Sequence, residues 1–480
     1  MSDWSFDPMT ANGVRMQVDA REPMAGAGQT DDRVRQLAGL QLLVVVEGLE
    51  RMAFYGMQSL LVLYVAKALL PHGSFDDTLL LPELNAAFRA PDIAALSSAI
   101  FGLFAGLLHA APHFGGVMSD RLIGRCRSIK LGGLVMSAGY FLLAWNYAFL
   151  LGLACIIVGS GMFKGNITSQ LGALYPDDDR RRSDGYQMFI LSASVGGIAA
   201  PILIGSIGEN INWQWGFATA GITMATGTAI YSAVSRRLPA NRIPEQTSLR
   251  GGGSEPEANK RGPVTPILLL ASILSVLLVP NFQIFNTCML WGDATFDLAV
   301  AAWRIPTSWL IMVDAVVSIL AIAGSLRFWN WWRRFHPEPD HFAKIIIGCS
   351  LVAGGMLILA LAAETVPPGG KINLLFPLLF HLVNAIGYVQ IVPVALSAFS
   401  RLAPSGLEGT VMGLFYLSFA SANVLTGWIG GGYVPTEVTR FWLFHAVLMA
   451  AGALGLLILR WRAAIQARRS GGGQQTMDKG

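Results

Sequence analysis

The sequence predicts an all-α membrane protein with twelve transmembrane helices in two six-helix bundles. Of its 480 residues, 53% are apolar and 13% are charged, whereas an ordinary soluble domain carries roughly 25% charged residues. Mean hydropathy is +0.51. Apolar runs repeatedly reach the roughly 20 residues that a spanning helix needs, and one polar stretch divides them six from six. This composition excludes a disordered chain, a nucleic-acid-binding protein and a disulfide scaffold.

The apolar runs place six helices on each side of the polar stretch. In the first half we expect helices at 37–66, 93–118, 128–148, 150–174, 186–208 and 213–234. In the second half we expect them at 264–290, 306–326, 343–364, 373–400, 409–430 and 438–460. The two bundles are therefore predicted to cover residues 37–234 and 264–462.

The remaining segments are polar. Residues 1–36 carry several acids and no apolar core, so they do not form a signal peptide. We expect a disordered cytoplasmic tail there and a second cytoplasmic tail at 463–480. Residues 235–263 lack an apolar run and are predicted to form a flexible cytoplasmic linker between the bundles.

The placement of Lys and Arg predicts the orientation, because cytoplasmic loops carry an excess of basic residues. If both termini are cytoplasmic, most basic residues fall on the cytoplasmic side. The external loops then hold only Lys67, Arg89, Arg304, Lys371 and Arg440. We therefore expect a multi-pass protein of the cytoplasmic (inner) membrane with both termini in the cytoplasm.

Two six-helix halves around a basic linker resemble the layout of the major facilitator superfamily. The loop 116–127 contains Asp120, Arg121 and Arg125 and is similar to the loop between helices 2 and 3 of that superfamily. The resemblance implies the major facilitator fold and a gating role for these three residues, which would lock the loop to a helix end in one state. The alternative is a basic loop that only sets the topology.

A stripe of polar and aromatic side chains follows one face of the predicted first helix: Glu47, Glu50, Arg51, Phe54, Tyr55 and Gln58. Each charge near the membrane centre costs ~2.5–3.5 kcal/mol even on insertion scales, so it must face a partner or a water-filled cavity. One interpretation is a structural ion pair. Two acids and one base leave a surplus carboxyl group, however, and a low dielectric favours its protonated form. The stripe therefore predicts proton binding.

Lys164 lies deep in the predicted fourth helix. A lysine at that depth needs an acid nearby, and we expect it to pair with Glu47 or Glu50. The small residues Gly161 and Gly165 would allow helices to approach closely around it. The alternative is a lysine that snorkels to the membrane interface.

The motif Glu47-x-x-Glu50-Arg51-x-x-Phe54-Tyr55-Gly56 resembles the ExxER[FY]xYYG motif of the proton-coupled oligopeptide transporter (POT) family, a branch of the major facilitators. Segments at 161–176, 213–217 and 403–416 resemble that family's helix 4, helix 6 entry and helix 10–11 loop, in the same order. The chain is therefore identified as a member of this family.

The resemblance implies roles for particular residues. The family's helix 1 glutamates take part in proton coupling, and Glu47 and Glu50 would do so here, together with Arg51 and Lys164. The motif arginine and the helix 4 lysine lie near the peptide carboxylate in the family. A guanidinium and an ammonium also form a good carboxylate clamp on physical grounds. The motif tyrosine, Tyr55, would line the same pocket.

Several positions depart from the family pattern. The helix 10 glutamate that meets the peptide's amino terminus is Tyr388 here, and the helix 7 glutamate is Phe282. The helix 5 asparagine that holds the peptide backbone is Ser194, and a helix 2 tyrosine is His109. A helix 8 asparagine is Asp314. The second bundle therefore loses two acids and gains one, and we expect Ser194, Tyr388, His109 and Asp314 to line the substrate site.

Asp314 lies deep in an apolar run, where an unpaired acid is costly. We expect it either to replace the missing helix 10 acid as the partner of a substrate ammonium or to pair with Lys164. The alternative is a neutral structural carboxyl group bonded to a neighbouring helix. His109, His113 and His381 are expected to make packing contacts or interhelical hydrogen bonds more than to relay protons.

The predicted function is a symporter that imports di- or tripeptides, or peptide-like molecules, by alternating access. The proton gradient drives it, with no cofactor or metal. One alternative is a divergent family member that carries another organic anion or a modified peptide. Another is a membrane sensor that binds a ligand without moving it.

The sequence holds no nucleophile–base pair or metal-ligand cluster that indicates an enzyme. The expected partners are protons, a short peptide or peptide-like acid and the lipid bilayer, without nucleic acid, and the protein is expected to be monomeric.

Overall fold

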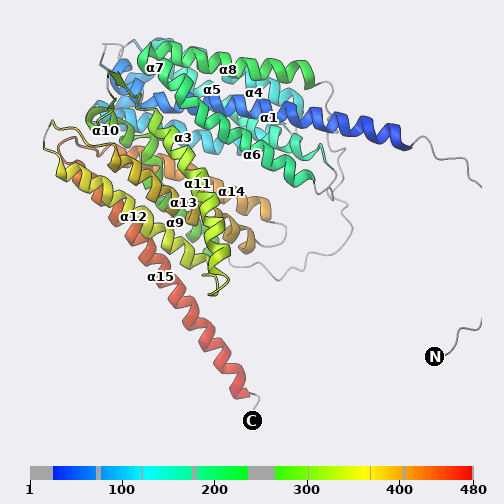
Figure 1. The fold of residues 1–480 in the computed structure, drawn as a ribbon, viewed down its shortest axis with the longest axis vertical. Coiled ribbons are helices and arrows are strands. Elements are labelled where there is room, and N and C mark those ends of the chain that lie inside the picture. Colours follow the sequence, from blue (N-terminus) through cyan, green and yellow to red (C-terminus); the bar gives the residue numbers. More distant parts are fainter. Residues whose placement is uncertain are drawn as a thin grey trace, which may run out of the picture.

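The computed structural model describes residues 25–71, 77–119, 123–175, 181–235, 265–300, 302–367, 369–403 and 407–477. These residues are almost entirely helical and form two bundles side by side (Figure 1). The first bundle consists of α1 (Ala25–Tyr64), the π-helical turn η1 (Val65–Leu69), α2 (Leu81–Phe88), α3 (Ile93–Met118), α4 (Arg125–Leu143), the 3₁₀ turn η3 (Asn146–Ala148), α5 (Phe149–Gly172), α6 (Arg181–Ala200), the π-helical turn η4 (Pro201–Gly205), α7 (Ser206–Asn210) and α8 (Trp213–Val234).

The second bundle repeats the helical pattern with one small hairpin added. It consists of α9 (Thr265–Phe282), the 3₁₀ turn η6 (Gln283–Phe285), α10 (Thr287–Thr295), β1 (Ala299–Val300), β2 (Trp303–Arg304), α11 (Trp309–Trp332), α12 (His341–Thr365), α13 (Leu375–Leu402), α14 (Glu408–Gly430) and α15 (Val438–Met477). The two strands pair antiparallel, with Val300 opposite Trp303.

Each bundle has its own hydrophobic core. One large cluster of buried apolar side chains lies within residues 40–231 and a second within 267–456. A small third cluster joins the bundles through Val62 and Leu63 of α1, Met289 of α10 and Ile311 of α11. The described part of the chain therefore packs around two main hydrophobic clusters.

Ten helical segments of the described chain are long and apolar enough to cross a membrane. The other two predicted spans are α4 and α8, helices of 19 and 22 residues. Both are rich in small residues, which lower the hydropathy but let helices approach closely. Gly132 and Gly139 of α4, for example, lie against Gly159 and Gly152 of α5. The all-α membrane fold is confirmed, and the helices are consistent with the twelve predicted.

The helices at the two ends of the described chain are longer than predicted. α1 begins at Ala25 and α15 continues to Met477, so residues 25–36 and 463–477 are helical rather than irregular tails. Both helices project beyond the bundles (Figure 1). Apolar runs mark only the part of a helix that crosses the membrane, so hydropathy could not show these extensions. Helix propensity does not explain the last part of α15 either, because it contains the glycines at 471–473. Residues 1–24 and nearly all of the predicted linker lie outside the described residues.

Candidate functional site

α1 holds three charged side chains on one face, because Glu47, Glu50 and Arg51 follow one another at helical spacing. Arg51 Nε lies 2.7 Å from Glu47 Oε1 and 3.5 Å from Glu50 Oε2. Glu47 is 1% exposed and Glu50 is 0% exposed, whereas the side chain of Arg51 is 26% exposed. The side chain of Arg51 therefore remains partly accessible while both acids are enclosed.

α5 adds Lys164 to this group. Its Nζ lies 3.7 Å from Glu50 Oε1 and 4.3 Å from the centroid of the Phe54 ring, a favourable cation–π contact. The predicted pairing of Lys164 with a helix 1 acid is confirmed, and snorkelling is excluded. Of the two glycines expected to ease the approach, Gly161 packs closely against α3, whereas Gly165 faces open space. We call Glu47, Glu50, Arg51 and Lys164 the charged cluster.

Glu50 connects the two cations of the charged cluster. Arg51 and Lys164 lie 3.5 and 3.7 Å from its carboxylate oxygens. Neither oxygen accepts a hydrogen bond from the described part of the chain. An ionised carboxylate this deeply buried depends on nearby cations to offset its desolvation, and a bound proton is the other way to neutralise it. Protonation of Glu50 would therefore weaken its hold on both Arg51 and Lys164.

Two tyrosines and an acid extend the site across the two bundles. Tyr388 of α13 interacts electrostatically with both Tyr55 of α1 and Asp314 of α11. The ring of Tyr55 also packs against Gly197 of α6. The structure therefore brings these three predicted residues to one region between the bundles.

His109 of α3 lies between aromatic rings of the second bundle. Its ring centroid is 6.2 Å from that of Phe282 and 6.0 Å from that of Phe419. Its Nδ1 is 2.8 Å from a backbone carbonyl oxygen of its own helix, and the ring lies within electrostatic range of Lys164 and Arg51. His109 thus makes the predicted packing contacts while it borders the charged cluster.

The hydroxyl of Ser194 on α6 does not contact the charged cluster in the structure. Its hydroxyl donates a hydrogen bond to the Ile190 carbonyl oxygen, 3.1 Å away on the same helix. Its neighbour Gly196 packs against Gly48 and Arg51 of α1. α6 therefore borders the charged cluster, but the hydroxyl of Ser194 is bonded to its own helix.

Asp314 finds its partner on α13. Its Oδ1 lies 3.1 Å from Nδ1 of His381. The side chain of Asp314 is 16% exposed and that of His381 is fully buried. The prediction that Asp314 pairs with Lys164 is wrong, because Lys164 is held by Glu50 in the first bundle while α11 packs against α13. His381 instead makes the interhelical hydrogen bond expected of it.

Residues 126–249 and 257–437 match the model of the POT family. The chain belongs to the POT family. It is similar to the peptide transporter YePEPT of Yersinia enterocolitica, with 25% identity over 90% of this chain and 96% of that one. It is also similar to dipeptide and tripeptide permease A of Escherichia coli, with 24% identity over 84% and 86% of the two chains. A crystal structure of a POT peptide transporter in complex with sulfate shares the fold, with a TM-score of 0.76, 21% identity and coverage of 88% and 94%.

POT family membership confirms the predicted family and the predicted major facilitator fold. As a POT family protein the chain is a membrane transporter and not an enzyme. The roles of its individual residues remain predictions, because neither family membership nor a shared fold assigns them.

Sequence reasoning missed a group of polar contacts that joins the bundles. Glu209 of α7 accepts hydrogen bonds from the backbone N–H groups of Thr307 and Ser308, at 2.7 and 2.8 Å. These amides belong to the start of α11, where backbone N–H groups lack partners within the helix. A carboxylate is favoured there by the helix dipole as well. Glu209 of the first bundle therefore caps a helix of the second.

A second acid completes this contact. Asp293 of α10 lies 2.8 Å from Nζ of Lys67 in η1 and 3.0 Å from the guanidinium of Arg304. We call Lys67, Glu209, Asp293 and Arg304 the interbundle clasp. Lys67 and Arg304 were assigned to external loops in the sequence. The sequence did contain a signal for this contact. Glu209 and Asp293 each follow the end of a predicted span, on the same side of the membrane as Lys67 and Arg304.

The predicted cytoplasmic gate is described only in part. Asp120 and Arg121 lie outside the described residues. Arg125 begins α4 and lines a surface cavity together with Tyr175, Arg182 and others. The gating role of these three residues remains a prediction.

Proposed function

We propose that this chain is a proton-coupled symporter that imports di- and tripeptides, or peptide-like acids, by alternating access. The observation that carries the proposal is the contact of one buried acid, Glu50, with both Arg51 and Lys164. Relatives named for peptide transport support the substrate class. A sensor without transport would need no such set of buried charges.

The charged cluster suggests how proton and substrate binding are linked. With Glu50 ionised, both cations are attracted to it. A proton on Glu50 removes that attraction and leaves Arg51 and Lys164 available to a substrate carboxylate. Charge-assisted hydrogen bonds of this kind are about twice as strong as neutral ones. Loss of the proton toward the cytoplasm would restore the ion pairs and release the substrate.

The opposite end of the site suggests how a substrate ammonium is held. Asp314 is an acid of the second bundle that interacts electrostatically with Tyr388, and its carboxylate is oriented by His381. A short peptide would then lie with its carboxylate at the charged cluster and its ammonium at Asp314. The distance between these groups would favour short chains over long ones.

The interbundle clasp supports an inward-facing state. It closes the bundles at the ends of α1, α7 and α10, while the side chains of Arg51 and Lys164 remain 26% and 18% exposed. We infer that opening of the clasp admits substrate from outside. We also propose that the protein is a monomer in the inner membrane and that both of its termini are cytoplasmic.

The substrate class is tested by uptake into proteoliposomes with an imposed proton gradient, using a mixed library of di- and tripeptides. We expect acidification outside to drive accumulation of several of them. Failure to carry any peptide, with transport of another organic acid, would favour a divergent family member. Tyr388 and Ser194, where the family has Glu and Asn, are the departures behind that second candidate.

Lys164→Ala tests the carboxylate clamp. Removing a cation from a desolvated charge pair costs on the order of 2–5 kcal/mol, so binding of free-acid dipeptides should weaken about 30-fold or more. The same dipeptides with amidated C-termini should lose far less. Affinities measured by competition against a labelled peptide check this, with Lys371→Ala at the exposed surface as the control. Equal losses for acid and amide would restrict Lys164 to proton coupling.

Glu209→Ala tests the interbundle clasp. It removes two charge-assisted hydrogen bonds, each worth about 1.5–3 kcal/mol, so backbone amides of residues 303–310 should exchange hydrogen for deuterium about a hundredfold faster or more. Mass spectrometry of the exchanged peptides measures this. Glu437→Ala, which breaks an ion pair with Arg440 at the start of α15, should leave that segment unchanged. Unaltered exchange in Glu209→Ala would show that the clasp does not hold the bundles together.

A further inference from the structure

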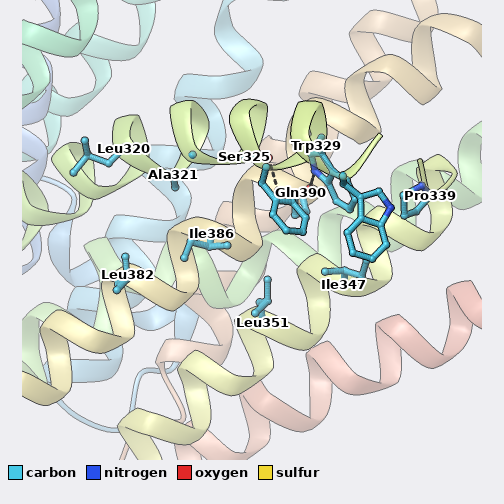
Figure 2. Close-up of a pocket in the computed structure, with 13 residues that line it drawn as sticks. Leu320, Ala321, Ser325, Trp329, Pro339, Ile347, Leu351, Leu382, Ile386 and Gln390 are labelled. Atoms are coloured by element: carbon cyan, nitrogen blue, oxygen red, sulfur yellow. Dashed lines mark hydrogen bonds between the residues drawn. The ribbon is translucent and has the colours of Figure 1, made fainter. Parts of the chain in front are cut away.

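A groove opens on the second bundle between α11 and α12, with α13 as its floor (Figure 2). Its volume is about 540 Å³. Its walls are mostly apolar and include Leu320, Phe328, Trp332, Ile347, Leu351 and Leu382. Every lining residue belongs to the second bundle, so the groove is separate from the charged cluster.

The groove faces away from the first bundle. α12 packs against α13 and α15, which places it on the outer side of the molecule (Figure 1). Leu320 is 65% exposed, and Phe328 and Leu382 are each 45% exposed, although all three belong to membrane-spanning helices. In a bilayer these side chains contact hydrocarbon, and an apolar cavity of this kind takes up apolar molecules rather than water.

The polar groups within the groove are already paired with one another. Trp329 Nε1 donates to Gln390 Oε1 at 2.9 Å, and Gln390 Nε2 donates to Ser325 Oγ at 2.7 Å (Figure 2). A polar ligand such as a peptide would therefore find few free partners on the floor. The interior fits a hydrocarbon chain better.

One end of the groove carries positive charge. Lys344 Nζ lies 4.7 Å from the centroid of the Trp329 ring, which lines the groove. Lys344 and Arg333 both contact Glu338, Arg333 at 3.4 Å. The hydrogen bond from Lys344 lowers the pKa of Glu338, so this acid is ionised at neutral pH. Two cations on one carboxylate leave a net positive charge at the groove end.

Further cations surround this end. Arg327 and Arg334 are exposed, and neither forms an ion pair with an acid of the described residues. The other nearby acid, Asp340, is paired with Arg460 at 3.0 Å. Trp331 and Phe335, 50% and 65% exposed, add aromatic side chains typical of a membrane interface. An anion at this depth of the membrane would be a lipid headgroup.

We propose that this groove binds one acyl chain of an anionic phospholipid, with the headgroup phosphate at Arg333 and Lys344. The phosphate takes over contacts that Glu338 makes in the structure. The chain lies over α13 between Leu320 and Ile347 and fills the space between α11 and α12. The lipid belongs to the leaflet on the side where α11 ends and α12 begins. Because α11 also carries Asp314, the bound lipid supports a helix of the transport site.

Native mass spectrometry of the full-length protein in detergent tests this, with dioleoyl phosphatidylglycerol and dioleoyl phosphatidylcholine as probes. We expect the anionic lipid to bind about tenfold more tightly, as charge-assisted contacts predict. The double variant Arg333→Gln/Lys344→Gln should reduce this preference to near one. Arg440→Gln, which removes a cation at the opposite membrane face, should retain it.

A second variant tests the groove itself. A Cβ at Gly324 meets no atom within 4 Å, so Gly324→Phe fills the groove without disturbing the helices and should weaken both lipids about tenfold. Glycerol phosphate, a headgroup without chains, should not compete at equal concentration. Equal binding of the two lipids, a preference that survives the double variant, unchanged binding in Gly324→Phe, or competition by glycerol phosphate would each overturn the proposal.

Discussion

Glu50→Gln should reduce uptake driven by a proton gradient to the rate seen without a gradient. Glutamine keeps the size of the side chain but cannot alternate between an ion pair and a carboxylic acid. Glu50 is fully buried and lies within 3.7 Å of both Arg51 and Lys164, so its charge determines whether the two cations are free. Uptake of a labelled dipeptide into proteoliposomes, with and without an imposed gradient, measures the effect.

Counterflow exchange provides the internal control for this variant. Exchange of labelled for unlabelled peptide needs substrate binding and alternating access but no net proton movement, so it should survive in Glu50→Gln. Glu83→Gln makes the same chemical change at the exposed surface of α2 and should behave like the parent. If gradient-driven uptake by Glu50→Gln equals that of the parent, Glu50 is only a structural partner of Arg51.

The charged cluster could be predicted because its members either lie close together in the sequence or need a partner of opposite charge. Glu47, Glu50 and Arg51 occupy one helix at fixed spacing, so helix geometry alone brings them together. Lys164 comes from a different helix, but a buried ammonium needs an acid, and few acids lie at its depth in the first bundle. Helical periodicity and the need to pair buried charges were therefore sufficient to predict this cluster.

The contacts in the second bundle and between bundles were not predictable in the same way. Hydropathy shows that Asp314 lies within a membrane span but not which face of its helix packs on which neighbour. His381 is 67 positions away in sequence, and its pairing with Asp314 depends on the rotation of both α11 and α13. Glu209 and Thr307 are likewise 98 positions apart. Such contacts follow from tertiary packing, which a single sequence does not specify.

Asp314→Asn should weaken binding of dipeptides with a free amino terminus about tenfold or more while sparing their N-acetylated analogues. A hydrogen bond to a charged group is worth about 1.5–3 kcal/mol, which corresponds to such a loss. Tyr388 carries no charge at neutral pH and Phe282 cannot carry one, so these replacements of the family's acids cannot neutralise an ammonium. Asp314 keeps 16% of its side chain exposed and interacts electrostatically with Tyr388, as does Tyr55.

The comparison of free and acetylated peptides separates recognition from structure. Asp314→Asn also removes the acid that accepts the contact from His381, so a general loss of stability would weaken both kinds of peptide equally. Asp297→Asn makes the same change at an exposed acid of the second bundle and should leave both affinities unaltered. If the parent itself binds acetylated and free peptides equally, the ammonium is not recognised. The transported molecule would then be an anion without an amine, and the pair of Asp314 and His381 would serve to hold α11 against α13.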